Sequence, residues 1–125
     1  MVDDSVPNRK LLCRLLKNGG FECTQAENGQ IGLDLVAGSI DAFDLILMDF
    51  EMPVMDGPTA TKAIRDTGYS RPIIGITGNV LDADRVIFTN AGANEVLYKP
   101  LTLTAFNECT KKLAASGSFG KNTGV

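Results

Sequence analysis

Histidine and tryptophan are absent from the 125 residues, and cysteine occurs three times. Without histidine the chain lacks the commonest metal ligand and the usual general base of enzymes. Its chemistry must therefore use carboxylates, hydroxyls, lysine or thiols. Cys13, Cys23 and Cys109 are odd in number and show no CxxC spacing, which predicts buried free thiols rather than a disulfide bridge or a zinc site.

An excess of basic residues is also missing, since 12 Lys and Arg face 15 Asp and Glu for a net charge of -3. Nucleic-acid surfaces need clustered Lys and Arg to neutralise phosphates, so we expect no nucleic-acid partner. No apolar run approaches the roughly 18 residues that span a bilayer. Asp3 and Asp4 stand where a signal peptide would be cationic. We expect a cytoplasmic protein without direct membrane contact.

Strand-like and helix-like segments alternate along residues 1–115, which predicts one α/β domain followed by a Gly/Ser-rich tail over residues 116–125. Such alternation favours a mostly parallel sheet with helices on both faces. The expected strands are residues 21–27, 44–49, 72–77 and 93–98. The expected helices begin after Ser5, Asn28 and Asp56, and two more cover residues 81–90 and 102–115.

Five polar residues are expected at the carboxyl ends of the strands, where open α/β sheets bind ligands. They are Asp3, Asp4, Asp49, Thr77 and Lys99. Singly, each has an ordinary structural explanation, because an Asp pair can cap a helix and an Asp or Thr often ends a strand. Their joint placement, delivered by separate segments, favours one functional crevice.

Three carboxylates brought close together repel one another, and a hard cation relieves that repulsion. Mg²⁺ prefers oxygen ligands and commonly shares its shell with a phosphoryl group. We expect Asp4 and Asp49 to bind Mg²⁺ directly and Asp3 to act through water. Asp49 is the candidate nucleophile on phosphorus, with Thr77 and Lys99 contacting the transferring oxygens.

Four segments resemble the signature segments of the receiver domains of two-component response regulators, in the correct order. They are Val2-Asp3-Asp4-Ser5, Leu47 to Gly57, Ile76-Thr77-Gly78 and Tyr98-Lys99-Pro100. The second is the most specific, with Pro and Gly four and eight residues after Asp49. The resemblance covers about residues 1 to 115 and is strongest to receivers of hybrid sensor histidine kinases. It implies a flavodoxin-like, doubly wound parallel sheet of five strands.

By this resemblance Asp49 is the phosphoacceptor, and Asp3 and Asp4 form the acidic pair for Mg²⁺. The backbone carbonyl of Glu51 completes the metal ligands. Thr77 is the switching hydroxyl, and Lys99 binds a phosphoryl oxygen or Asp49. The implied donor is a histidine phosphotransfer protein or a sensor histidine kinase, while the oligomeric state is left open.

Two departures from the family pattern stand out. The family often has an aromatic residue three positions before the lysine, where this chain has Val96, and Tyr98 is expected on the face opposite Lys99. The usual aromatic switch is therefore not expected here. Met1-Val2 is only a short remnant of the first strand, so this strand is expected to be truncated.

Two other functions fit parts of the pattern. An aspartyl-nucleophile phosphatase resembling haloacid dehalogenases would need a second Asp two residues after Asp49, where Glu51 stands. A receiver-like binding module that takes no phosphate would not need all five polar residues. Multiple turnover on a phosphomonoester would favour the first alternative, and an absence of Mg²⁺ binding would favour the second.

Overall fold

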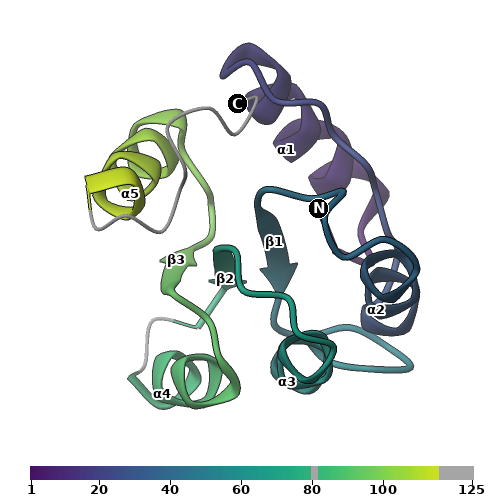
Figure 1. Cartoon of the computed structure of the whole chain (residues 1–125). Coiled ribbons are helices and arrows are strands. Elements are labelled where there is room, and N and C mark those ends of the chain that lie inside the picture. Colours follow the sequence, from purple (N-terminus) through teal and green to yellow (C-terminus); the bar gives the residue numbers. More distant parts are fainter. Residues whose placement is uncertain (80–81, 116–125) are drawn as a thin grey trace.

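From residue 29 onwards, helices and strands alternate as the sequence predicts. The computed structural model describes residues 1–79 and 82–115. Figure 1 shows their arrangement. In chain order the elements of this part are α1 (Val6–Asn18), α2 (Gly29–Gly38), β1 (Ile46–Asp49), α3 (Gly57–Asp66), β2 (Ile73–Thr77), α4 (Asp82–Ala91), β3 (Glu95–Tyr98) and α5 (Leu103–Ala115). The expected tail at 116–125 lies outside the described residues.

The three strands are parallel and adjacent in the order β1-β2-β3. Met48 of β1 lies opposite Gly75 of β2, and Ile76 of β2 lies opposite Leu97 of β3. Parallel neighbours need a long crossover connection, which α3 supplies between β1 and β2 and α4 supplies between β2 and β3. The predicted α/β class with a parallel sheet is confirmed.

The expected five-stranded sheet is not confirmed. The segments at residues 1–2 and 21–27, expected as two further strands, form only isolated β-bridges. Val2 forms one parallel bridge with Ala26 and another with Met48. Its carbonyl accepts the Asp49 amide at 2.9 Å. Only the short segment from Met1 to Asp3 lies between residues 21–27 and β1, so these residues have no partner long enough for a ladder. The strand predicted there is wrong beyond the single bridge at Ala26.

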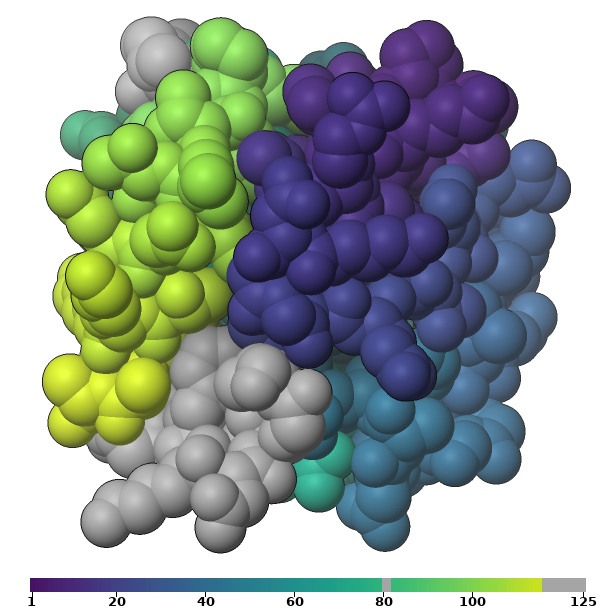
Figure 2. All heavy atoms as spheres, turned by 90° about the horizontal axis from the view of Figure 1, so that it is seen from above, coloured from purple at the N-terminus to yellow at the C-terminus, as the bar shows by residue number. Residues whose placement is uncertain are grey.

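The two faces of the sheet carry separate apolar clusters, because alternate strand residues point to opposite sides. Helices α1 and α5 cover one face and the other three helices pack on the opposite face, as Figure 1 shows. Figure 2 looks onto α1 (purple) and α5 (yellow-green) side by side. The first cluster includes Leu12, Leu16, Leu47, Ile74, Ile76, Phe106 and Leu113. The second includes Val36, Ile46, Met48, Ala60, Ile64, Ile73 and Phe88.

Side-chain caps fix where three of the helices begin. The oxygens of Ser5, Asn28 and Asp56 each accept a backbone N–H from three residues further on, at 3.4, 2.9 and 2.8 Å. These bonds satisfy donors that the first helical turn leaves without partners. The three predicted starts are confirmed. None of the helices in residues 1–79 and 82–115 has both the length and the apolar character that a membrane span requires.

The cysteine prediction is wrong for two of the three residues. Cys13 of α1 and Cys23 form a disulfide with their Cα atoms 5.6 Å apart. The chain reverses at Gly19 and Gly20 and brings the following segment back beside α1, a proximity that spacing in sequence does not show. Cys109 is free and buried as predicted. Burial, together with the charge of Glu95, raises the pKa of the Cys109 thiol to about 11.

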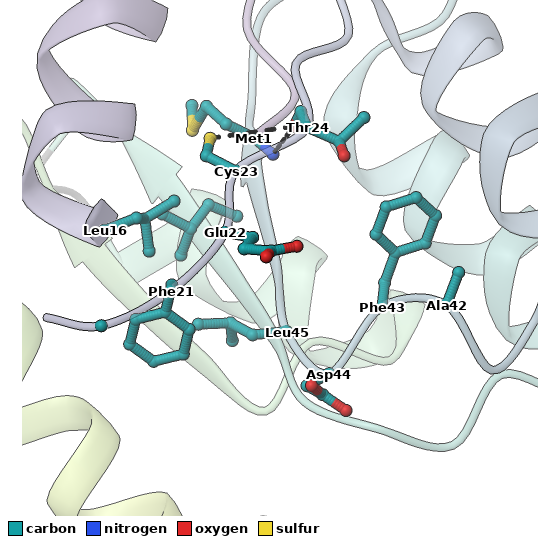
Figure 3. A pocket seen from close by; sticks show the side chains of 12 residues that line it. Met1, Leu16, Phe21, Glu22, Cys23, Thr24, Ala42, Phe43, Asp44 and Leu45 are labelled. Carbon is teal, nitrogen blue, oxygen red and sulfur yellow. Dashed lines mark hydrogen bonds between the residues drawn. The ribbon is translucent and has the colours of Figure 1, made fainter. Parts of the chain in front are cut away.

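A cavity of about 430 Å³ lies at the amino-terminal end of β1, between Met1 and the segments 21–24 and 42–45 (Figure 3). The Met1 amino group donates to the Thr24 carbonyl at 2.9 Å, and burial lowers the pKa of this amine to about 6. The predicted site residues follow the carboxyl ends of the strands. This cavity therefore lies at the end of the sheet away from the predicted site.

Gly57 lies directly against the end of β1. A Cβ atom at this position would collide with the carbonyl oxygen of Asp49 and approach Cζ of Phe88 to 2.9 Å. Because the first contact is with backbone, the strand end would have to shift. We expect Gly57→Ala to lower the free energy of unfolding by about 2–3 kcal/mol, measured by urea denaturation.

Gly38→Ala is the matched control, since a Cβ atom there meets nothing within 4 Å. Its free energy of unfolding should change by less than about 1 kcal/mol. Equal losses in the two variants, or an unchanged Gly57→Ala protein, would contradict the close approach.

Candidate functional site

Four segments bring the predicted site residues to one edge of the sheet. Asp49 ends β1, Thr77 ends β2, and Lys99 follows β3 directly. Asp3 and Asp4 follow Val2, whose bridge to Met48 places them beside the end of β1. A cavity of about 620 Å³ opens there, and it is lined by Asp4, Asp49, Phe50, Glu51, Met52, Pro53, Thr77, Gly78, Asn79 and Lys99.

The three carboxylates form one cluster. Asp3, Asp4 and Asp49 each offer an oxygen, and these oxygens lie within 4.8 Å of one another. Asp3 and Asp49 are buried, with 0% and 3% of their surface exposed, whereas Asp4 is exposed. The cluster thus has two buried carboxyl groups, and the third, on Asp4, opens to solvent.

Asp3 shows how well the cluster suits a hard cation. Its Oδ1 accepts the Ser5 amide at 2.8 Å. Its Oδ2 is buried and has no hydrogen-bond partner among the described residues. Lys99 Nζ lies 3.9 Å from it, beyond hydrogen-bond distance, so this buried oxygen still carries a desolvation cost that a bound cation or its water would offset. The donor set consists of oxygens, as Mg²⁺ prefers.

Lys99 supplies the positive charge of the site. Its Nζ lies 2.6 Å from Oδ1 of Asp49 and 3.9 Å from Oδ2 of Asp3. Burial alone would lower the pKa of Lys99, but the hydrogen bond and charge of Asp49, with the charges of Asp3 and Asp4, raise it. Lys99 is therefore a fixed ammonium at neutral pH.

The pKa of Asp49 is raised, first by burial of the carboxyl and also by the charges of Asp3 and Asp4. The hydrogen bond from Lys99 acts in the opposite direction. Crowding and desolvation thus make ionisation of Asp49 costly, and Lys99 only partly offsets that cost. A divalent cation at the cluster would favour the ionised, nucleophilic form.

The loop after Asp49 forms one wall of the cavity. The Phe50 amide donates to the Ile76 carbonyl at 2.9 Å, and the Gly57 amide donates to the Phe50 carbonyl at 2.8 Å. These bonds hold the two ends of the loop against the sheet. Glu51 is exposed and lines the cavity. Its expected use of the backbone carbonyl as a metal ligand stays a prediction.

Thr77 is buried at the end of β2, and its hydroxyl has two partners. Oγ1 donates to Oδ2 of Asp84 at 2.8 Å and accepts the Asn79 amide at 3.0 Å. Asp84 belongs to the first turn of α4. The hydroxyl is thus engaged by the helix that follows it rather than by an acidic residue of the cluster.

Two contacts of the site have no signal in the sequence. Arg9 of α1 donates through Nη1 to the Asp3 carbonyl at 2.7 Å, and so ties the first acidic residue to the first helix. The sequence gives no signal for the contact of Asp84 with Thr77 either, because the two residues belong to different elements, α4 and β2, and no spacing rule connects them.

Comparisons with known proteins agree with this geometry. Residues 1–111 match the family described as "Response regulator receiver domain". Over 104 residues the chain is 39% identical to the two-component response regulator ORR41 of Oryza sativa subsp. japonica, with 82% of each chain covered. Over 108 residues it is 36% identical to the sensor histidine kinase RcsC of Salmonella typhi, covering 86% of this chain and 11% of the kinase.

Among solved structures, the chain matches the CheX-CheY-BeF3-Mg²⁺ complex of Borrelia burgdorferi with a TM-score of 0.85 and 24% identity. The match covers 90% of this chain and 85% of that chain, and at this identity it shows the fold alone. The chain belongs to the response regulator receiver family. It is a receiver domain of two-component signalling, and its relatives include hybrid sensor kinases and plant and fungal proteins.

Removing the ammonium of Lys99 should destabilise the fold in a pH-dependent way. Lys99→Met keeps the alkyl stem but leaves Asp49 buried beside Asp3 without its counter-charge. In Mg²⁺-free buffer at neutral pH we expect the free energy of unfolding to fall by about 1–3 kcal/mol in urea denaturation. The pKa of Asp49 is higher in the folded than in the unfolded protein, so folding penalises its ionised form. As the pH falls through this raised pKa, Asp49 is protonated and no longer needs a counter-charge, so the loss of stability should shrink.

Lys112→Met provides the control, because it breaks an ion pair of 2.8 Å with Glu95 in which the lysine side chain is 70% exposed. Exposed pairs contribute less than about 1 kcal/mol. A Lys99→Met variant as stable as the Lys112→Met variant at every pH would show that Lys99 does not compensate the buried carboxylates.

Proposed function

We propose that this receiver domain, taken as residues 1–115, accepts a phosphoryl group on Asp49 in a Mg²⁺-dependent reaction. The donor is a phosphohistidine on a histidine phosphotransfer protein or a sensor histidine kinase. The observation that carries the proposal is the contact of 2.6 Å between Lys99 and Asp49 inside a cluster of three carboxylates. This cluster borders a cavity large enough for a phosphoryl group.

The acidic cluster would hold the metal through Asp4 and Asp49, with Asp3 acting through water and the Glu51 carbonyl as a further ligand. Bound there, Mg²⁺ would neutralise charge on the carboxylates and on the transferring phosphoryl oxygens. The Oδ2 of Asp3 supports this assignment, since it is buried, accepts no hydrogen bond among the described residues and lies 3.9 Å from the ammonium of Lys99.

Asp49 is the nucleophile in the proposed transfer. One of its carboxylate oxygens forms a bond to phosphorus while the P–N bond to the donor imidazole breaks, and the electron pair of that bond returns to the ring nitrogen. Lys99 Nζ, now beside Asp49 Oδ1, would stay within reach of a phosphoryl oxygen. Thr77 can donate to another oxygen once its hydroxyl leaves its present acceptor.

The choice of donor rests on chemistry and on the relatives. These 125 residues contain no histidine, so a phosphohistidine donor must lie outside them. Its relatives include the Salmonella sensor histidine kinase RcsC and a hybrid signal transduction histidine kinase of Dictyostelium discoideum. These relationships support a phosphohistidine donor for this chain as well.

Phosphorylation of Asp49 is tested by intact-mass analysis after incubation with Mg²⁺ and a small acyl phosphate. We expect one phosphoryl adduct on the wild-type protein and none on Asp49→Asn, because the amide cannot act as the nucleophile. The matched control is Asp56→Asn, which keeps an oxygen for the α3 cap and should still form the adduct. An adduct on Asp49→Asn, or none on the wild type, would refute the proposal.

Binding of Mg²⁺ is tested through stability. A ligand at a hundred times its Kd adds about 2.7 kcal/mol to the free energy of unfolding, so Mg²⁺ should raise the Tm and a chelator should reverse the rise. We expect Asp4→Asn to lose most of this effect. Asp41→Asn changes an exposed acid at the other end of β1 and should keep it. Equal stabilisation of both variants would show that the cation binds elsewhere.

A further inference from the structure

The hydroxyl of Thr77 is committed to the helix α4. A threonine hydroxyl has one proton to donate, and here Oγ1 donates it to Oδ2 of Asp84 at 2.8 Å. The same oxygen accepts the Asn79 amide at 3.0 Å. Because a lone pair faces Asn79, the proton of the hydroxyl points toward Asp84. Thr77 is 2% exposed, so water has little access to replace either partner.

We propose that Asp84 is a positioning residue that holds the Thr77 hydroxyl away from the phosphoryl site until Asp49 is phosphorylated. This inference rests on the function proposed above. The single proton of Thr77 cannot be given to Asp84 and to a phosphoryl oxygen at once. Phosphorylation must therefore break the bond to Asp84, and the bond in turn opposes phosphorylation.

Because Asp84 belongs to α4, a change of hydrogen-bond acceptor by the Thr77 hydroxyl would alter a contact of this helix. Asp84 lies in the first turn of α4, and Phe88 is the buried residue of this helix in the described part of the chain. The Phe88 ring packs against Phe50 in a T-shaped contact at 5.2 Å and lies where a Cβ on Gly75 would meet it at 2.6 Å. The helix is thus anchored one turn beyond Asp84, and the bond from Thr77 holds its first turn.

Breaking this bond costs the activated state the energy of a hydrogen bond to a carboxylate. Asp84 is half-buried rather than fully buried, so water can solvate its carboxylate after release. The net cost should be that of a partly solvated charged hydrogen bond, and removing Asp84 should make the phosphorylated conformation easier to reach. A ligand that binds this conformation should then bind more tightly.

Beryllofluoride with Mg²⁺ is the probe, titrated by calorimetry against the full chain, alongside the rate of adduct formation with a small acyl phosphate. We expect Asp84→Ala to raise beryllofluoride affinity and phosphorylation rate about fivefold to tenfold. Asp84→Asn keeps an acceptor oxygen and should raise them less. Asp82→Ala removes the same charge from the same helical turn and should leave both near the wild-type values.

A double-mutant cycle with Thr77→Ala separates positioning from simple charge repulsion. If Asp84 acts through the Thr77 hydroxyl, Asp84→Ala has no effect once Thr77 is alanine. If the Asp84 charge merely repels the anion, the gain persists in the Thr77→Ala background and the inference is overturned. Wild-type affinity and rate in Asp84→Ala would overturn it too.

The two proposals fail in different ways. A wild-type protein that binds no beryllofluoride and takes no phosphoryl group contradicts the proposed function. A wild-type protein that does both, with no gain in Asp84→Ala, contradicts only the role of Asp84. Thermal melts of each variant identify any that is unfolded. If Asp84→Ala is unfolded, Asp84→Asn is compared with the wild type in its place.

Discussion

The structure depends on one ammonium group placed among three carboxylates. Lys99 lies 2.6 Å from Asp49, which is almost fully buried beside the wholly buried Asp3. Anions this close raise the cost of ionising one another, and a partial counter-charge is what allows them to share a site. Lys99 reduces that cost without removing it, since the pKa of Asp49 remains raised. This residual imbalance is what a further cation, as proposed for Mg²⁺, would neutralise.

Close backbone approaches hold these charges in place. Gly57 packs against the Asp49 carbonyl, and Gly75 leaves the room on β2 that the Phe88 ring fills. Larger residues at either position would move a strand end or a helix, and the distances within the charge cluster would change with it. The glycines beside the site therefore help to set the distances between its charges. These distances matter because Coulomb energies vary steeply with separation at short range.

The sequence predicts best those features that follow from a local run of residues. The apolar run ending in Asp49 predicts a buried parallel strand, which the structure shows, and the family that the motifs around Asp49 and Lys99 indicate is confirmed by the match of residues 1–111. Prediction failed where the outcome depends on neighbours distant in sequence. Residues 21–27 have strand-like composition but pair only with the short segment from Met1 to Asp3, and the bridge between Cys13 and Cys23 depends on how tightly the chain turns between them.

The hydrogen bond between Thr77 and Asp84 also depends on neighbours distant in sequence, and it bears on how a change at Asp49 could reach α4. Val96, at the position where receivers often carry an aromatic residue, is buried and apolar in the core beside Phe88. No aromatic ring at this position is available to follow the hydroxyl when it moves. The contact that must change with the hydroxyl is its bond to Asp84. In the proposed switch, a polar exchange of one proton between two acceptors, rather than the rotation of a ring at this position, would therefore link the proposed phosphoacceptor Asp49 to α4.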